Sequence, residues 1–373
     1  MDCPFDYNIF QQIYCLSFAS NIVSGFKGSE KDLEKRMTEA LNKVLPCLPG
    51  DWVISWGPRV FKKDDPNSSC GPPDNVWFAA VSEAQKTCVT AIAGTAHGST
   101  AAILQDLDVY KVVDFNAWVE EWSPSKIPKP QASDPCEIDD STVAYCAEGT
   151  CIGVWNILSN TSEAAGEVMR IDQYLSRLDT SYKIVFTGHS LGGVLSPIVA
   201  LGLYTADMIG THDDVKVLPS AGVSPGNSKL ESDYATSFPK CPPSAKDYQV
   251  YNTDYYNEFD IVPQAWSINL LTDRNLSKIL RKILHFEKCA GKLPKKLVEL
   301  AEYLSWKSNI QYKPLPGQKF TGPQPPEEIG SWDEAMEIVG TEHNQAYWDE
   351  IGIIEFVNLF QQRLRSGDGE AGK

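Results

Sequence analysis

The amino-acid sequence predicts an α/β protein with one mostly parallel central sheet and helices on both of its faces. Segments with strand character alternate with helix-forming segments through the middle of the chain. A β-branched run at 183–187 leads through a glycine-flanked serine, Ser190, directly into a helix-forming segment. The chain has 373 residues, 42% of them apolar, which is enough for a large core. We therefore expect a single domain over residues 1–373, with a helical insertion at about 267–340.

The first part of the chain predicts two helices followed by three strands. The second helix begins after the capping residue Ser29 and ends at Pro46, which cannot continue it. The strands are short apolar runs separated by turn residues. In chain order, the expected elements are helices at 4–24 and 29–45 and strands at 52–56, 76–81 and 88–93.

The middle of the chain continues this alternation. A helix is expected at 161–178, where Val168, Ile171, Leu175 and Leu178 fall on one face. Residues 122–141 are rich in proline, serine and aspartate and predict a long surface loop. The remaining expected elements are strands at 108–115, 183–187, 215–218 and 248–252 and a helix at 193–207.

Ser190 lies at the tip of a sharp strand-to-helix turn. In such a turn the serine takes a strained backbone conformation, and its hydroxyl projects above the edge of the sheet. Gly188 and Gly192 fit the turn because strand and helix approach too closely there for a Cβ atom. Leu191 begins the helix, so its N–H has no acceptor within the helix and is a candidate oxyanion donor. The pattern indicates an α/β-hydrolase architecture with a serine nucleophile.

A serine nucleophile needs a histidine base, which in this architecture follows the serine and the acid in the chain. Of the five histidines, His97 and His189 precede the serine. His212 lies before a strand, at the wrong end of the sheet, and His285 lies inside a predicted helix. His343 remains, in a predicted loop late in the chain and just before an apolar helix. We expect it to be the base.

The base needs a carboxylate to orient it, and two aspartates compete for this role. Both Asp254 and Asp260 follow the expected strand at 248–252. Asp260 precedes an Ile-Val-Pro sequence, which favours an extended exit from the loop. Asp254 lies nearer the strand and also fits a turn or a helix cap. The residues alone do not decide which of the two aspartates orients the base.

Together these features resemble the class 3, fungal-type triacylglycerol lipase family over about residues 76–350. The nucleophile turn matches the family's pattern as far as the second glycine after Leu191, and the other blocks follow in the family's order. The blocks are Ala93–Thr95, Gly188–Gly193, Gly222–Asn227, Asn257–Pro263, and His343 with Tyr347.

The resemblance implies a role for each matching residue. Ser190 would be the nucleophile, Asp260 the acid and His343 the base, which favours Asp260 over Asp254. Thr95 and Leu191 would donate their N–H groups to the oxyanion.

The resemblance also implies a lid over the acyl site, and the chain departs from the family's pattern beside it. Residues 96–106 would form the lid, with Ala102, Ile103 and Leu104 on its apolar face. The family has an arginine at the position of Ala93, so the contacts of that side chain must be replaced here.

The insertion contains a basic segment in an acidic chain. Residues 274–296 carry eight lysines or arginines against one acidic residue, whereas the whole chain has a net charge of −16. Apolar residues in the same segment predict an amphipathic helix. Either the helix is a solvated element docked on the core, or it caps the active site and contacts a lipid surface or an anionic substrate group.

Composition argues against one class of partner, and it does not decide between the cytoplasm and secretion. The acidic balance, with a pI near 4.8, argues against nucleic acid as a partner. The first residues show no signal peptide, which favours the cytoplasm, whereas ten cysteines and three N-x-S/T sequons fit secretion. Cys136 and Cys146 flank a loop and are either a disulfide or two free thiols.

The sequence thus predicts a lipase-like serine carboxylester hydrolase that needs no metal or cofactor. Its partner would be a lipid or another ester substrate, with transient contact to a lipid interface. One alternative is a catalytically inactive lipase-like scaffold. Another keeps the chemistry and changes the substrate to a phospholipid, a feruloyl ester or a polyester.

Overall fold

A computed structural model describes residues 5–95, 108–210, 212, 214–242, 245–283, 293–326 and 328–368. Its centre is a sheet of seven strands in the order β1-β2-β3-β8-β9-β10-β11. The strand β2 pairs antiparallel with both β1 and β3, and the pairs from β3 to β11 are all parallel. The strands are β1 (Val53–Phe61), β2 (Asn75–Ser82), β3 (Thr87–Ile92), β8 (Lys183–His189), β9 (Val215–Ser220), β10 (Asp254–Asn257) and β11 (Gly317–Phe320). The predicted α/β-hydrolase fold is confirmed.

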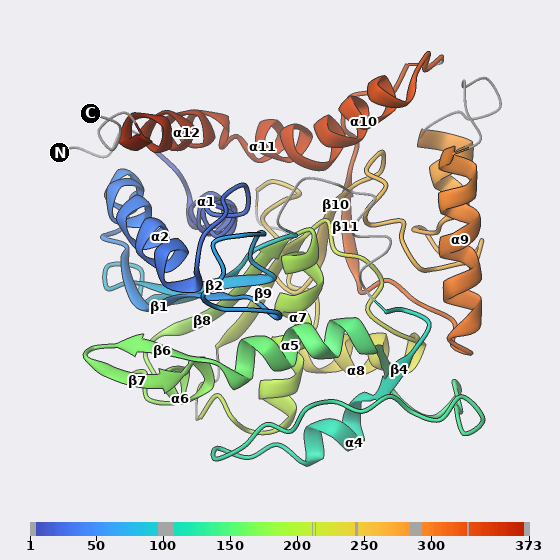
Figure 1. Cartoon of the computed structure of the whole chain (residues 1–373), viewed down its shortest axis with the longest axis horizontal. Helices are drawn as coiled ribbons and strands as arrows, with labels where there is room; N and C mark the ends of the chain where they lie inside the picture. Colours follow the sequence, from blue (N-terminus) through green and yellow to red (C-terminus); the bar gives the residue numbers. More distant parts are fainter. Residues whose placement is uncertain are drawn as a thin grey trace.

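Helices cover both faces of this sheet (Figure 1). The four helices α1, α2, α11 and α12 pack on one face, while α4, α5, α7 and α8 lie towards the other. Their bounds are α1 (Ile9–Ala19), α2 (Glu30–Val44), α4 (Phe115–Glu120), α5 (Glu148–Ser159), α7 (Leu191–Thr205), α8 (Ser228–Ser237), α11 (Ala346–Ile351) and α12 (Ile354–Asp368).

The two faces receive alternate side chains of the same strands. Along β2, Trp77 and Ala79 pack into one hydrophobic cluster, whereas Phe78 and Ala80 pack into the other. This is the period of two that a strand buried on both faces requires. A third cluster contains Ile261, Trp266 and residues of the insertion. The remaining elements are η1 (Leu45–Cys47), β4 (Val112–Asp114), β5 (Tyr145–Ala147), β6 (Thr161–Ala164), β7 (Glu167–Arg170), α6 (Ile171–Leu175), η2 (Ile279–Ile283), α9 (Leu293–Lys307), α10 (Trp332–Gly340) and η3 (Thr341–Gln345).

The prediction of a helix at 161–178 is wrong. The strands β6 and β7 form a hairpin there, and only α6 is helical. Ala165 and Gly166 lie at its tip with φ of 50° and 84°, the left-handed pair that a tight hairpin turn requires. Val168, counted on the apolar face of the helix, is exposed. Its spacing from the next apolar residues is therefore coincidental.

Two predicted strands are also misplaced. The strand expected at 108–115 shrinks to β4, and the strand expected at 248–252 begins later, as β10. Asn252 adopts a left-handed conformation with φ of 67°, and it bonds to both backbone groups of Val217. It therefore ends the preceding loop and aligns β10 with β9.

The structure decides between the two alternatives for the cysteine pair, and it shows a strand as well as helices in the insertion. Cys136 is an exposed free thiol and Cys146 is a buried one, so they form no disulfide. The insertion is only partly helical, because β11 adds to the central sheet beside β10. Arg274 lies buried in the interior, so it contributes nothing to a basic surface. Within the described residues, no helix is both long and apolar enough to cross a membrane.

Candidate active site

Ser190 occupies the tip of the turn between β8 and α7. Its φ of 61° and ψ of −121° place it in a conformation that non-glycine residues rarely adopt. A Cβ atom on Gly188 would lie 2.3 Å from the carbonyl oxygen of Gly192. One on Gly192 would lie 2.1 Å from the oxygen of Ile92. The expected crowding around the serine is therefore present in the structure.

His343 lies 7% exposed beside the same turn. The expected loop around it is wrong: His343 belongs to η3, a π-helical turn that continues α10 into α11. Turns of this kind are frequent at functional sites because they widen the helix and redirect side chains. The Nδ1 atom of His343 lies 2.8 Å from Oδ2 of Asp260. The structure thus brings together the predicted base and one of the two predicted acids.

Asp260 is fully buried, and neutral donors hold its carboxylate. The N–H of Val262 donates to Oδ1 at 2.9 Å, and the hydroxyl of Tyr347 donates to Oδ2 at 2.9 Å. The same hydroxyl accepts a bond from the N–H of Asn257 at 3.0 Å. Burial raises the pKa of Tyr347 well above its ordinary value, so the hydroxyl keeps its proton for Asp260.

Asp254 lies elsewhere, inside β10. Its Oδ2 accepts a bond from Nη1 of Arg274 at 2.5 Å, and its Oδ1 accepts one from the N–H of Gly222 at 3.0 Å. Arg274 is equally buried, and its guanidinium lies 4.4 Å from the centre of the Tyr256 ring. Asp254 therefore joins the insertion to the sheet.

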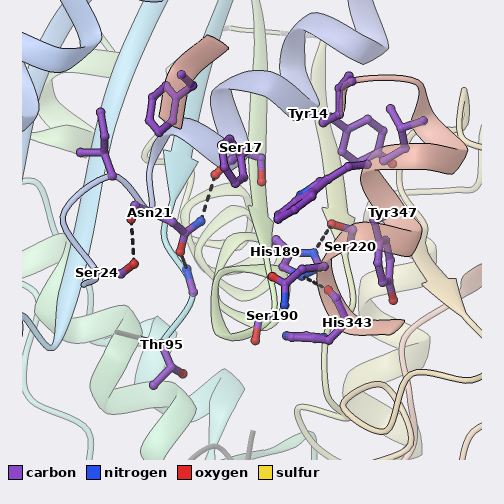
Figure 2. A pocket seen from close by; sticks show the side chains of 18 of the residues that line it. Tyr14, Ser17, Asn21, Ser24, Thr95, His189, Ser190, Ser220, His343 and Tyr347 are labelled. Atoms are coloured by element: carbon purple, nitrogen blue, oxygen red, sulfur yellow. Dashed lines mark hydrogen bonds between the residues drawn. The ribbon is translucent and has the colours of Figure 1, made fainter. Parts of the chain in front are cut away.

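The two predicted oxyanion donors lie at the same end of the sheet. Leu191 is the first residue of α7, where an N–H has no acceptor within the helix. Thr95 follows β3 and lines the cavity that Ser190 also lines (Figure 2). The N–H of its neighbour Gly94 donates to Oδ1 of Asn21 at 2.8 Å. Asn21 has no signal in the local sequence, because it lies more than 70 residues before Gly94.

A cavity of about 370 Å³ opens beside Ser190 and His343. Polar side chains from the last turn of α1 and from the loop that follows it, including Asn21, line one part of the cavity (Figure 2). Apolar and aromatic side chains line the rest, namely Phe18, Ile22, Trp348, Ile351, Ile353 and Phe360. The predicted lid residues Ala102, Ile103 and Leu104 lie outside the described residues. In the described part of the chain, no three side chains of His, Cys, Asp or Glu gather as metal ligands.

His189 is part of this site, although its place before the serine in the chain excluded it as a base. Its imidazole lies between β8 and the π-helical turn, in contact with the rings of His343 and Tyr347. The chain-order rule excludes it as the base and gives no hint of this contact.

Comparison with known proteins agrees with this architecture. Residues 145–270 match the family model of the class 3 lipases. M37 lipase is similar over 94% of this chain and 95% of its own, with a TM-score of 0.68 and 20% identity. The nonglycosylated LIP2 lipase of Yarrowia lipolytica matches over 69% of this chain and 74% of its own, with a TM-score of 0.41 and 19% identity. A search by sequence among functionally characterised proteins gives no significant match.

The structural likeness supports the fold, and the family match supports the chemical class. The matched segment contains three of the five blocks that carry the resemblance in the sequence, among them the nucleophile turn and the block with Asp260, whereas Thr95 and His343 lie outside it. The chain therefore has the fold of M37 lipase, the α/β-hydrolase fold, and its residues 145–270 are similar to the class 3 lipase family.

Proposed function

We propose that the protein is a serine carboxylester hydrolase that cleaves acylglycerols or related lipid esters through an acyl-serine intermediate. The observation that supports this best is the bond between Nδ1 of His343 and Asp260, made at a cavity that Ser190 also lines. A carboxylate on Nδ1 selects the tautomer whose Nε2 is free to accept a proton.

In the proposed mechanism, Oγ of Ser190 attacks the carbonyl carbon of the ester while Nε2 of His343 takes its proton. The N–H groups of Thr95 and Leu191 stabilise the oxyanion that forms. The intermediate collapses to the acyl-serine, and His343 returns the proton to the departing alcohol. Water then attacks the acyl-serine with His343 again as the base, which releases the fatty acid and restores Ser190.

The cavity supports an apolar substrate. Its volume lies within the range of about 300–1,000 Å³ that is typical of small-molecule sites, and most of its wall away from Ser190 is apolar. An acyl chain or a hydrophobic alcohol would be removed from water there, which favours lipid esters over small polar esters.

The decisive experiment replaces the nucleophile. Ser190→Ala should lower kcat on p-nitrophenyl esters by at least about 10⁴-fold, because catalysis by a triad fails when its nucleophile is removed. Ser232→Ala, a change at an exposed serine of α8, is the matched control and should leave kcat unchanged. A wild-type protein that neither hydrolyses a chain-length series of these esters nor reacts with a fluorophosphonate would contradict the proposal. That result would favour the inactive scaffold.

A further inference from the structure

The imidazole of His189 bridges two structural elements at the site. Its Nε2 lies 2.7 Å from the backbone oxygen of His343, and its Nδ1 lies 2.9 Å from Oγ of Ser220. Its ring centre lies 4.7 Å from that of His343 and 5.0 Å from that of Tyr347. The residue before the nucleophile therefore contacts the backbone of the proposed base (Figure 2).

The hydrogen bonds determine the tautomer of His189. A carbonyl oxygen only accepts, so Nε2 carries the proton and donates it to His343. Nδ1 then accepts from the hydroxyl of Ser220. Burial, followed by repulsion from His343, lowers the pKa of His189 well below its ordinary value. The ring thus stays neutral beside a base that must itself take up a proton.

A second side chain holds the preceding carbonyl of the same turn. Nδ2 of Asn257, at the end of β10, donates to the backbone oxygen of Glu342 at 3.1 Å and to Oε2 of its side chain at 2.6 Å. Two consecutive carbonyls of the π-helical turn, those of Glu342 and His343, are therefore bonded from the ends of two strands of the sheet. Strands are rigid supports, so these hydrogen bonds hold the π-helical turn in a fixed position relative to the sheet.

We propose, on the basis of the function proposed above, that His189 is a positioning residue for His343. Its Nε2–H fixes the main chain of the base, while Asp260 fixes the ring. With both points held, the free Nε2 of His343 stays in one place relative to Ser190. The geometry of proton transfer is sensitive to such placement, since a shift of about 1 Å can cost about 100-fold in rate.

Three variants separate the two hydrogen bonds of His189. His189→Leu removes both bonds. His189→Gln places an amide group near the position of the ring Nε2 and keeps a donor for the carbonyl of His343. His189→Asn reaches only as far as Nδ1, so it keeps a partner for Ser220 and loses the carbonyl of His343.

The readouts are kcat and KM on a p-nitrophenyl ester, together with the thermal midpoint of each variant. We expect His189→Leu and His189→Asn to lower kcat by about 10- to 100-fold with KM within about twofold. His189→Gln should recover kcat to within about fivefold of the wild type. A purely structural role would instead change the thermal midpoint and leave kcat per folded molecule the same in all three variants.

Two results would overturn the proposal. The first is a His189→Leu protein with wild-type kcat, and the second is an equal loss of kcat in the Gln and Asn variants. If His189→Leu does not fold, the Gln and Asn pair still decides.

Nuclear magnetic resonance of the histidine rings gives a readout that does not depend on turnover. The chain has only five histidines, so the Nδ1 proton of His343 can be assigned with few candidate signals. It should broaden or shift in His189→Asn and remain in His189→Gln. Absence of ester hydrolysis in the wild type would contradict the proposed function, and this signal would still decide whether His189 holds His343.

Discussion

Two aspartates, one at the start of β10 and one just after its end, have almost the same burial and different partners. Asp254 is 3% exposed and is paired with Arg274, a side chain that keeps its charge at every physiological pH. Asp260 is 0% exposed and bonds to His343, which is charged only when it holds a second proton. A few residues along one segment thus separate an aspartate that is paired with an arginine from one that is paired with a histidine.

The difference teaches how a buried carboxylate is prepared for each role. Asp254 receives a full positive charge, which offsets only part of its loss of water, since burial still raises the pKa of Asp254 to about 6. The same pair fixes the insertion against the sheet. Asp260 receives neutral donors, from Val262 and Tyr347, so its negative charge is not cancelled. It therefore remains available to stabilise the imidazolium that would form on His343 during proton transfer.

The largest expected effect follows from breaking the pair of Asp260 and His343. Asp260→Asn should lower kcat by about 10⁴-fold, because the amide selects the wrong tautomer of His343. Steady-state kinetics on a p-nitrophenyl ester measures it, with Asp349→Asn, at an exposed position of α11, as the control. A variant that stays within tenfold of the wild type would remove Asp260 from the proposed mechanism.

Breaking the pair of Asp254 and Arg274 should affect stability instead. Asp254→Ala removes the closest carboxylate from the buried Arg274 charge and leaves only the exposed Asp273, 3.8 Å from its Nε, which should lower the free energy of unfolding by about 3–5 kcal/mol. Urea denaturation measures this change, and kcat per folded molecule should stay within about threefold.

The double variant Asp254→Ala/Arg274→Met tests whether the buried Arg274 charge causes the loss of stability in Asp254→Ala. Removing both charges should recover part of the lost stability, because neither group is then buried without a partner. A fully folded Asp254→Ala protein without activity would reverse the assignment of the two aspartates.

The smallest expected effect concerns the neutral donor. Tyr347→Phe removes the hydroxyl that Asp260 and Asn257 share, and it leaves one buried N–H and one carboxylate lone pair without this partner. We expect kcat to fall by about tenfold, which corresponds to about 1.4 kcal/mol. Wild-type kcat in this variant would mean that the bond from Val262 is sufficient to hold Asp260.

The parts of the site that the sequence could predict are those set by local geometry or by exclusion. The glycines around Ser190 are required by contacts within a few residues, so the turn is visible in the chain itself. His343 follows from chain order among only five histidines. Asp260 and Asp254 could not be separated in this way, because the partner that distinguishes them, Arg274, comes from the insertion.

The remaining misses share a physical cause, which is that tertiary contacts outweigh local pattern. Residues 168–178 have helical spacing, yet the left-handed turn at Ala165 and Gly166 forms a hairpin. Asn252 looks like the end of a strand and instead bonds across to Val217. Asn21 and His189 act through partners far away in the sequence, to which no local periodicity points.

The cavity beside Ser190 has walls from opposite ends of the described chain. Phe18 comes from α1 and Phe360 from α12, and these two rings pack against each other. A chain emerging from the ribosome would have its nucleophile turn long before it has α12. Substrate binding should therefore begin only after α12 has been made and has packed against α1, so a chain that stops before α12 would contain Ser190 without the complete pocket beside it.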